Sequence, residues 1–180
     1  NSAATVEDTI KSVVNQDYKN IEYIIIDGLS KDNTLDIVNK YKDKIALVVS
    51  EKDQGIYDAI SKGIKKATGD IVVALNSDDM YASNDVISKV AELFKNSHAD
   101  AVYGDLNYVD RNDTTKIVRK WKSGTYKKGQ FLKGWMPPHP TFFVRKHCYE
   151  KYGSFNLTLK SAADYELMLR FIHKHHIKLA

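Results

Sequence analysis

The sequence predicts an α/β fold, in which short β-strands alternate with amphipathic helices. Apolar runs rich in β-branched residues recur through residues 1–100, and the stretches between them carry apolar residues at helical spacing. Two runs, at residues 21–26 and 71–75, are apolar almost throughout, as expected for strands covered on both faces. This order of elements is typical of βαβ units, which build a parallel sheet through right-handed crossovers.

The elements of the first half follow from these patterns in order. Thr5 and Asp8 have the spacing of a helix-capping pair, and Val6, Ile10 and Val13 follow them at helical intervals. The expected elements are helices over residues 5–16, from 33, over 56–67 and over 86–95, with strands over 21–26, 45–50 and 71–75.

After residue 100 the pattern changes to strand-like pieces joined by loops that contain Gly and Pro. These pieces cover residues 101–109, 116–121 and 141–144, and a last helix is expected over 162–175. The stretch MPPHP at residues 136–140 predicts a constrained loop, and no repeat or low-complexity segment interrupts the chain. We therefore expect a single domain over residues 1–180.

Composition and charge exclude several classes of protein. The 180 residues are 43% hydrophobic and 28% charged, which is ordinary for a globular domain. The net charge of +4 comes from 27 basic and 23 acidic residues spread along the chain, so no nucleic-acid partner is predicted. Only residues 116–133 are locally basic, and they are either a solvated loop face or a contact for an anionic substrate or lipid headgroup. The basic residues of this segment are Lys116, Arg119, Lys120, Lys122, Lys127, Lys128 and Lys133.

Cysteine usage and hydropathy indicate a cytoplasmic protein. Cys148 is the single cysteine, so no intrachain disulfide can form, and a reducing compartment is expected. No apolar run has the length of a membrane span, and no signal peptide is visible. Peripheral association with the inner face of the membrane remains an open alternative.

Two adjacent aspartates, Asp78 and Asp79, follow the apolar run at residues 71–75. At a separation of ~4 Å two carboxylates repel each other by about 1 kcal/mol even in bulk water, which predicts a cation nearby. Asp27 follows the run at residues 21–26 in the same way. Because ligands in open α/β sheets bind outside the carboxyl ends of the strands, these aspartates are candidate ligand contacts. Turn and capping roles are the alternative for all three.

The glycine-rich phosphate loops of common nucleotide sites are missing. The sequence has neither GxxxxGK[ST] nor GxGxxG after a predicted strand, which excludes a P-loop NTPase and a dinucleotide dehydrogenase. A site that offers carboxylates instead must hold phosphates through a bridging divalent cation. Mg²⁺ and Mn²⁺ prefer oxygen ligands and fit this requirement.

Four groups of residues together carry a family resemblance. They are NQDYKNIEYIIIDGLSKDNT (15–34), EKDQGIYDAISKGIKKATGDIVVALNSDD (51–79), VYGD (102–105), and MPPHPTFFVRK (136–146) followed by ADYELMLRF (163–171). On these stretches the chain resembles the family 2 glycosyltransferases, and within them the bacterial transferases of O-antigen and capsule assembly. Each stretch alone is weakly specific, whereas the ordered set spans nearly the whole chain.

The resemblance implies the GT-A fold of nucleotide-diphospho-sugar transferases, a Rossmann-like, mostly parallel sheet flanked by helices. Residues 1–100 would form the nucleotide-binding half and residues 101–180 the acceptor-side half. The first strand of that fold normally ends in a Tyr-Asn pair, and we expect it to lie outside this sequence, with Asn1 as its last residue. A C-terminal part of the fold is likewise expected to be missing.

The resemblance also implies roles for individual residues. Asp27 would hydrogen-bond the base of the nucleotide, commonly uracil. Ser77, Asp78 and Asp79 occupy the place of the DxD motif, in which Asp79 would coordinate the metal and Asp78 would face the ribose or the metal's water shell. Asp164 falls where the family has its catalytic base, although its place near the start of a helix is also explained by a favourable interaction with the helix dipole.

The chain departs from the family pattern at two positions and leaves further residues open. The DxD motif begins with Ser77, and Ile60 stands near the place of a nucleotide-holding arginine, for which Lys62 is the candidate substitute. His139, in its proline-flanked loop, is either structural or a contact for the acceptor or a phosphate. For Trp135 the alternatives are stacking on a sugar ring or a core position. Asp105 either faces the acceptor or forms a turn.

These observations predict an inverting, metal-dependent glycosyltransferase. It would move a sugar from a nucleotide-diphosphate donor, with UDP expected, to a glycan or lipid-linked acceptor in cell-surface polysaccharide biosynthesis. A single base without a second carboxylate nucleophile implies inversion at the anomeric carbon. The alternatives are a non-catalytic nucleotide-binding or interaction module and a sugar-nucleotide pyrophosphorylase.

Overall fold

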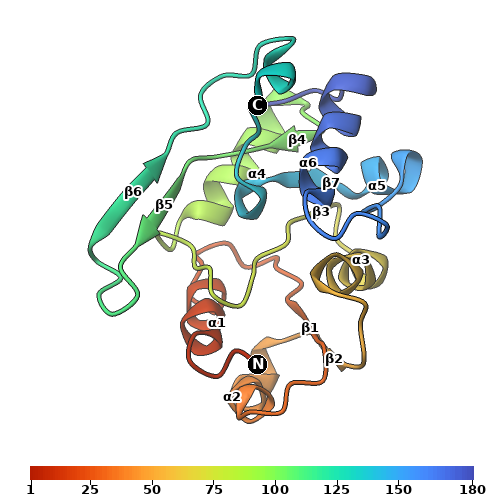
Figure 1. Ribbon diagram of the computed structural model, residues 1–180. Helices are drawn as coiled ribbons and strands as arrows, with labels where there is room; N and C mark the ends of the chain where they lie inside the picture. The colour runs from red at the N-terminus through yellow and green to blue at the C-terminus, as the bar shows by residue number, and fades with distance from the viewer.

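Two groups of elements lie side by side in the computed structural model, which describes residues 1–180 (Figure 1). The first group, toward the N-terminus, contains α1 (Val6–Val14), β1 (Ile24–Asp27), α2 (Thr34–Asn39), the 3₁₀ turn η1 (Lys42–Lys44) and β2 (Leu47–Ser50). Helix α3 (Ile56–Lys66) connects it to the second group. No helix combines the length and the apolar character needed to cross a bilayer.

The second group contains all later elements. They are β3 (Ile71–Val72), α4 (Val86–Ser97), β4 (Ala101–Val102), β5 (Leu106–Val109), β6 (Ile117–Trp121), the 3₁₀ helices η2 (Gln130–Lys133) and η3 (His139–Thr141), β7 (Phe143–Arg145), α5 (Lys146–Tyr152), α6 (Ala163–Met168) and the π-helical turn η4 (Leu169–Lys174). Nearly every predicted element is therefore present, and most boundaries lie within two or three residues of the prediction.

Strands β1 and β2 are parallel, as predicted for a βαβ unit. Their register pairs Ile24 with Leu47 and Asp27 with Ser50, so both strands end at the same edge. A small apolar cluster from α1 and α2, centred on Ile10 and Val38, packs against the strands, and α3 also contacts β1. This arrangement brings the residues that follow β1 and β2 together.

The other strands pair antiparallel, which differs from the mostly parallel sheet predicted. Strand β7 lies between β3 and β4 and is antiparallel to both, and β5 and β6 form an antiparallel hairpin. The apolar stretch Phe142, Phe143 and Val144 can be covered on both faces, and it therefore takes the central position of this sheet. Strand β3 ends at Val72, and the last part of the predicted strand at 71–75 has no ladder partner.

One local expectation was wrong, and one helix was missed. Thr5 precedes α1, but its side chain makes no capping hydrogen bond to the helix; its hydroxyl instead approaches the carbonyl oxygen of Ser2 at 3.5 Å. Helix α5 was not predicted, because its seven residues, KHCYEKY, are too few to establish a helical period. Cys148 and Tyr149 nevertheless anchor this helix in the core.

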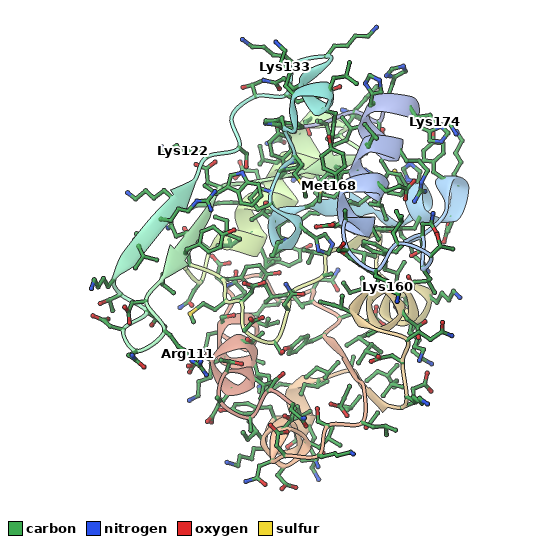
Figure 2. The ribbon with its side chains drawn as sticks, viewed as in Figure 1. Arg111, Lys122, Lys133, Lys160, Met168 and Lys174 are labelled. Carbon is green, nitrogen blue, oxygen red and sulfur yellow. The ribbon has the colours of Figure 1, made fainter.

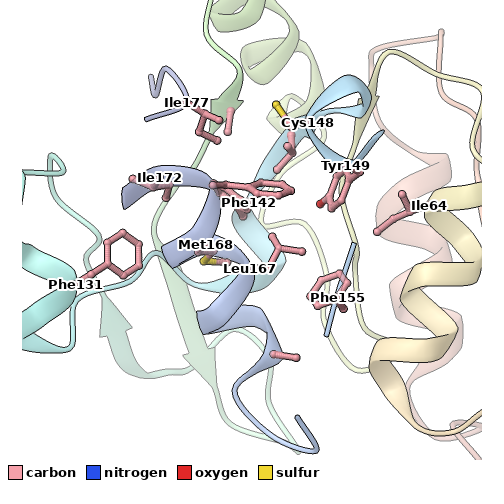
Figure 3. Close-up of a cluster of buried hydrophobic side chains, with 14 residues drawn as sticks. Ile64, Phe131, Phe142, Cys148, Tyr149, Phe155, Leu167, Met168, Ile172 and Ile177 are labelled. Atoms are coloured by element: carbon pink, nitrogen blue, oxygen red, sulfur yellow. The ribbon is translucent and has the colours of Figure 1, made fainter. Parts of the chain in front are cut away.

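The main hydrophobic core lies in the second group of elements (Figure 3). Fourteen buried side chains from α3, β4, β7, α5, α6 and the loops between them form one cluster. Leu167, Met168 and Phe171 are fully buried on the last helical segment, which is therefore fixed in position relative to β7 and α5. This core determines where the start of α6 lies, and with it Asp164.

A matched pair of leucines tests this account of the core. Leu167 is fully buried, whereas Leu132 is 82% exposed. We expect Leu167→Ala to lower the free energy of unfolding by about 2–5 kcal/mol, because it removes buried methyl groups and leaves a cavity. Leu132→Ala should change it by less than about 0.5 kcal/mol. Urea denaturation of both variants measures the difference, and equal losses would contradict the assignment of the core.

Candidate functional site

Asp27 is held at the end of β1 by hydrogen bonds from two serines. The parallel register places Ser50 opposite Asp27, and the Ser50 hydroxyl donates to Oδ2 at 2.6 Å. The backbone N–H of Ser30 donates to the same oxygen at 3.1 Å. Burial alone would raise the pKa of Asp27, but these hydrogen bonds outweigh it and hold the pKa below its usual range. Asp27 therefore remains a carboxylate although it is only 6% exposed.

The first two residues connect the ends of β1 and β3. The amino group of Asn1 donates to Ser30 Oγ at 2.9 Å, and Asn1 Oδ1 accepts from the backbone N–H of Lys31 at 2.7 Å. The hydroxyl of Ser2 shares a 2.7 Å hydrogen bond with the hydroxyl of Ser77. The loop that follows Asp27 and the segment that begins at Ser77 thus meet at one edge of the molecule.

The adjacent pair Asp78 and Asp79 lies immediately after Ser77. Asp78 is exposed, whereas Asp79 is partly buried and accepts a 2.8 Å hydrogen bond from Asn76 Nδ2. Burial, together with the charge of Asp78, raises the pKa of Asp79, and the bond from Asn76 offsets this only in part. Neither carboxylate belongs to a salt bridge of the chain.

The chemistry of this pair fits a divalent cation. A half-buried carboxylate beside a like charge gains stability from an external cation, and two carboxylates with open lone pairs are a common protein share of a Mg²⁺ or Mn²⁺ site. Ser77 contributes no third carboxylate, since its hydroxyl is bonded to Ser2. Asp79 is the better ligand candidate because burial makes its charge more dependent on a partner.

Asp164 lies in a second group of polar and aromatic residues. The Tyr57 hydroxyl, on α3, donates to Asp164 Oδ1 at 3.0 Å, across 107 positions of sequence. Tyr57 stacks on Phe155 with ring centroids 5.3 Å apart, and His139 meets the same ring edge-on at 5.5 Å. Burial lowers the pKa of His139, while the nearby charge of Asp164 partly opposes this shift. The structure therefore brings Tyr57, His139 and Asp164 together, with a largely neutral imidazole.

Both interpretations of Asp164 are compatible with its position. It lies in the first turn of α6, where a negative charge interacts favourably with the helix dipole. Its hydrogen bond from Tyr57 occupies Oδ1, and Oδ2 has no partner among the hydrogen bonds of the chain. Glu166, two residues later, is instead paired with Arg170 at 2.7 Å. Asp164 is thus the carboxylate at the start of α6 that keeps an oxygen available.

Lys62 braces the loop between β2 and α3. Its ammonium group lies 3.0 Å from Glu51 and 3.4 Å from Asp58, and it donates to the carbonyl oxygen of Lys52 at 2.8 Å. The hydrogen bond to Glu51 is the main cause of the raised pKa of Lys62. Lys62 therefore lies near the ends of β1 and β2, but its contacts are all within the chain.

Trp135 and Asp105 lie together in a different part of the second half. The Trp135 indole N–H donates to the carbonyl oxygen of Ser123 at 2.8 Å, and its ring packs with Tyr126 and Phe131. Asp105 Oδ1 accepts a 2.9 Å hydrogen bond from the backbone N–H of Ser123. These contacts favour the structural interpretation of both residues, which are not in the Tyr57, His139 and Asp164 group.

Two candidate residues were missed. Tyr57 had no local signal, because only the tertiary structure brings it to Asp164. Asp53 lies so close to Gly28 that a Cβ at Gly28 would be 2.2 Å from Asp53 Oδ2, and Asp53 Oδ1 accepts a 2.9 Å hydrogen bond from the N–H of Gly55. The glycine after Asp27 is the signal that could have revealed this close approach.

A third polar group, at the other end of β3, was also not predicted. His147 Nε2 lies 3.3 Å from Asp100 Oδ1 and 3.6 Å from Cys148 Sγ, and such a set of ligand atoms could hold a metal ion. Arg145 pairs with Ile71 at the start of β3, so this group lies away from the residues that follow the strand. Burial raises the pKa of Cys148 to about 12, which keeps it a thiol in the absence of a metal.

Two surface cavities are lined by none of the predicted site residues, although the rings of Tyr103 and Tyr126 that line one of them pack on Trp135. One, of about 490 Å³, is lined by the aromatic rings of Tyr103 and Tyr126 and by the last residues of the chain. The other, of about 300 Å³, is polar and is lined by Arg145, Lys146 and His147. Neither is lined by Asp27, Asp78, Asp79 or Asp164, so the electrostatics and hydrogen bonds above, and not cavity size, define the candidate site.

Comparison with known proteins gives a consistent result. The family described as Glycosyl transferase family 2 matches residues 1–153. A "PGL/p-HBAD biosynthesis glycosyltransferase" of Mycobacterium bovis is 28% identical over 174 residues, which are 94% of this chain and 65% of that protein. An uncharacterized glycosyltransferase of Mycobacterium tuberculosis is 32% identical over 164 residues, 90% of this chain and 62% of that protein. The chain thus spans less than two thirds of these relatives.

Solved structures agree on the fold. TarS of S. aureus, in complex with UDP, has a TM-score of 0.74 at 22% identity and covers 94% of this chain, which matches 52% of TarS residues 1–349. The mannosyltransferase PcManGT of Pyrobaculum calidifontis, in complex with GDP-Man and Mn²⁺, has a TM-score of 0.74 at 19% identity, with 99% of this chain and 51% of that one. The α/β fold class predicted from the sequence is confirmed.

The lowered pKa of Asp27 predicts a pH-dependent contribution to stability. Because the pKa in the folded chain lies below the unfolded value of about 3.9, the contribution is complete above that pH and is lost as the pH falls through the folded pKa. The difference in unfolding free energy between the wild type and Asp27→Asn should therefore be constant near neutral pH and shrink in acid. Urea denaturation across an acidic pH series measures it.

Ser50→Ala provides the control for this prediction. The variant removes one hydrogen bond to the carboxylate, so the acid-dependent part of the difference should become smaller but persist through Ser30. The proposed cause would be contradicted if this difference in unfolding free energy grew on acidification, or if Ser50→Ala left its acid-dependent part unchanged.

Proposed function

Because the chain belongs to glycosyl transferase family 2, we propose that it transfers a sugar, with inversion, from a nucleotide-diphosphate donor to a glycan or lipid-linked acceptor. The donor is a UDP-sugar, and the process is the assembly of a bacterial cell-surface polysaccharide on the cytoplasmic side of the membrane. The observation that carries the proposal is the carboxylate pair Asp78 and Asp79, which has no cationic partner and lies at the same edge as Asp27.

Asp27 is suited to hold the nucleotide base. A carboxylate offers about four lone-pair positions, and the bonds from Ser30 and Ser50 leave room to accept an N–H of uracil. Asp53, packed on Gly28, places a second carboxylate next to the loop that follows Asp27. Structures of similar fold are complexes with UDP, UDP-GlcNAc or GDP-Man, which supports a nucleotide sugar as ligand. Lys62 would act indirectly, because its ion pair with Glu51 holds the loop between β2 and α3 in place.

Asp79 would coordinate Mn²⁺ or Mg²⁺, and Asp78 would contact the ribose or the water shell of the ion. When bound, the ion supplies Lewis-acid stabilisation of the negative charge that develops on the departing diphosphate. Burial of Asp79 makes its ionised form depend on that partner. A similar fold that binds GDP-Man and Mn²⁺ supports a divalent ion without identifying it for this chain.

Asp164 is the proposed base. The acceptor hydroxyl is a weak acid, so its proton must be removed as its oxygen attacks the anomeric carbon. Tyr57 donates to Oδ1 and fixes the orientation of the carboxylate, which leaves Oδ2 to take the proton. Glu166 is paired with Arg170 and is therefore a poor candidate for a second carboxylate nucleophile, which supports a single displacement with inversion.

The remaining candidates would act on the acceptor side. His139 lies close enough to Asp164 to sense its charge and, as a neutral imidazole, can hydrogen-bond the acceptor or a phosphate oxygen. Trp135 and Asp105 would act indirectly, because both shape the loop at Ser123. A non-catalytic nucleotide-binding module remains the alternative, and transfer assays decide between the two.

The Asp164 assignment can be tested by separating transfer from binding. We expect Asp164→Asn to lower the rate of sugar transfer by about 10²–10⁴-fold, because the amide cannot accept the proton. UDP affinity should stay within about twofold of the wild type, since Asp164 does not contact the nucleotide in this proposal. Asp43→Asn, an exposed acid in η1, is the matched control and should retain both properties. Rapid transfer by Asp164→Asn would refute the role.

The metal assignment can be tested by calorimetry with UDP. Wild-type affinity for UDP should rise by at least about tenfold when Mn²⁺ is present, because the ion joins the carboxylates to the diphosphate. Asp79→Asn should abolish this gain, and weak binding of UDP in the absence of the ion should survive. Asp43→Asn again serves as the control. Identical Mn²⁺ effects on the wild type and Asp79→Asn would exclude Asp79 as a ligand.

A further inference from the structure

The locally basic segment at residues 116–133 forms one outer edge of the molecule, here called the basic edge. It contains β6, the loop after it and η2, and the hairpin of β5 and β6 projects from the body (Figure 1). Figure 2 places Lys122 and Lys133 along this edge, at the periphery of the view. All seven basic side chains of the segment are exposed, and the segment contains no acidic residue.

The positive charges of the basic edge are not neutralised within the chain. None of the seven basic residues belongs to a salt bridge, although acidic side chains elsewhere pair with Lys11, Lys62, Lys89 and Arg170. Arg119 is the one with a distinct partner, since its guanidinium lies over the Tyr108 ring at 5.1 Å. An external anionic surface could therefore interact with several of them at once.

Apolar side chains are exposed between these charges. Leu132 is the most exposed large apolar side chain of the chain at 82%, and Val118 is 58% exposed. Both have basic neighbours, with Lys133 next to Leu132 and Lys120 two residues from Val118 on the same face of β6. Adjacent basic and apolar side chains are typical of surfaces that lie in the interface of a membrane.

The fold holds Leu132 outward. Its neighbour Phe131 is 2% exposed and packs against the rings of Trp135 and Tyr165. Gly129 and Gly134 flank η2 in left-handed conformations, with φ of 87° and 77°, which any other residue would adopt with strain. Because Phe131 is fixed inside this tight turn, the next side chain must point away from the core. Leu132 is thus presented by a rigid turn.

We propose that the basic edge docks on a bilayer that contains anionic phospholipids, with Leu132 inserted among the headgroups. The lysines and arginines meet the negative surface potential, and each contributes roughly a fivefold gain in partitioning. A nucleic acid fits less well, because single strands require aromatic faces on which bases stack. Here Arg119 covers Tyr108, and Trp135 is packed among other rings.

The docking itself does not require sugar transfer. Its consequence for substrate choice rests on the proposed function: a chain held at the bilayer would act on an acceptor anchored in that bilayer. Lipid-linked acceptors are then favoured over free glycans.

Co-sedimentation with vesicles tests the proposal. The wild type should sediment with phosphatidylcholine vesicles that contain phosphatidylglycerol and stay in solution with phosphatidylcholine alone. We expect the double variant Lys127→Glu, Lys128→Glu to lower partitioning by at least about tenfold, and Leu132→Ser to lower it by about tenfold. The matched controls are Lys65→Glu with Lys66→Glu on α3, which changes the net charge equally, and Leu93→Ser on α4; both should bind like the wild type.

Three other outcomes would overturn the docking. Equal losses in the controls would mean that net charge alone drives binding, and binding to neutral vesicles would remove the role of the basic residues. Tighter binding of a single-stranded oligonucleotide than of anionic vesicles would assign the edge to nucleic acid. Asp164→Asn should sediment like the wild type. A wild-type chain that binds vesicles but transfers no sugar would refute the proposed function and leave the docking intact.

Discussion

The proposed site depends on keeping Asp79 charged beside Asp78 while it is half-buried. The segment after β3 carries these carboxylates, and Ser77 ties it to Ser2 and thereby to the loop after Asp27. Asp27 resolves the same electrostatic problem with hydrogen bonds from Ser30 and Ser50, whereas Asp79 receives only one, from Asn76. The two carboxylates, one at the end of β1 and one in the segment after β3, thus differ in how the chain stabilises them. Asp27 is stabilised by hydrogen bonds within the chain, whereas we propose that Asp79 is stabilised by a divalent cation.

A second connection joins the two groups of elements. Helix α3 begins beyond the loop that holds Asp53 against Gly28, and its Tyr57 reaches across to Asp164 on α6. The orientation of Asp164 is therefore coupled to the loop at the end of β2. If that loop contacts the nucleotide, as proposed, helix α3 links the position of the proposed catalytic base, Asp164, to the donor side of the site. The aromatic ring of Phe155 packs against both Tyr57 and His139 beside this connection.

Local patterns predicted much of this structure, and long-range contacts account for the rest. The positions of Asp27 at the end of β1 and of Asp78 and Asp79 in the segment after β3 followed from apolar runs that stop before acidic residues, which is a signal within ten residues of sequence. The antiparallel insertion of β7 could not be predicted, because strand direction depends on the path of the intervening 70 residues. The bond between Tyr57 and Asp164 spans 107 positions and has no periodic signature. The role of Trp135 could not be predicted either, because an aromatic residue in a loop has the same sequence pattern whether it packs inward or faces a ligand.

The pKa of Asp79 tests the central claim most directly. Carboxyl chemical shifts of Asp79 can be followed by NMR across an acidic pH range, first for the chain alone and then with Mg²⁺ and UDP. The account predicts a pKa above the usual range of an aspartate in the free chain, and a clear fall when the ion and the nucleotide are added together. If the pKa of Asp79 stays unchanged when Mg²⁺ and UDP are added, the view that this carboxylate holds a metal against a diphosphate is contradicted.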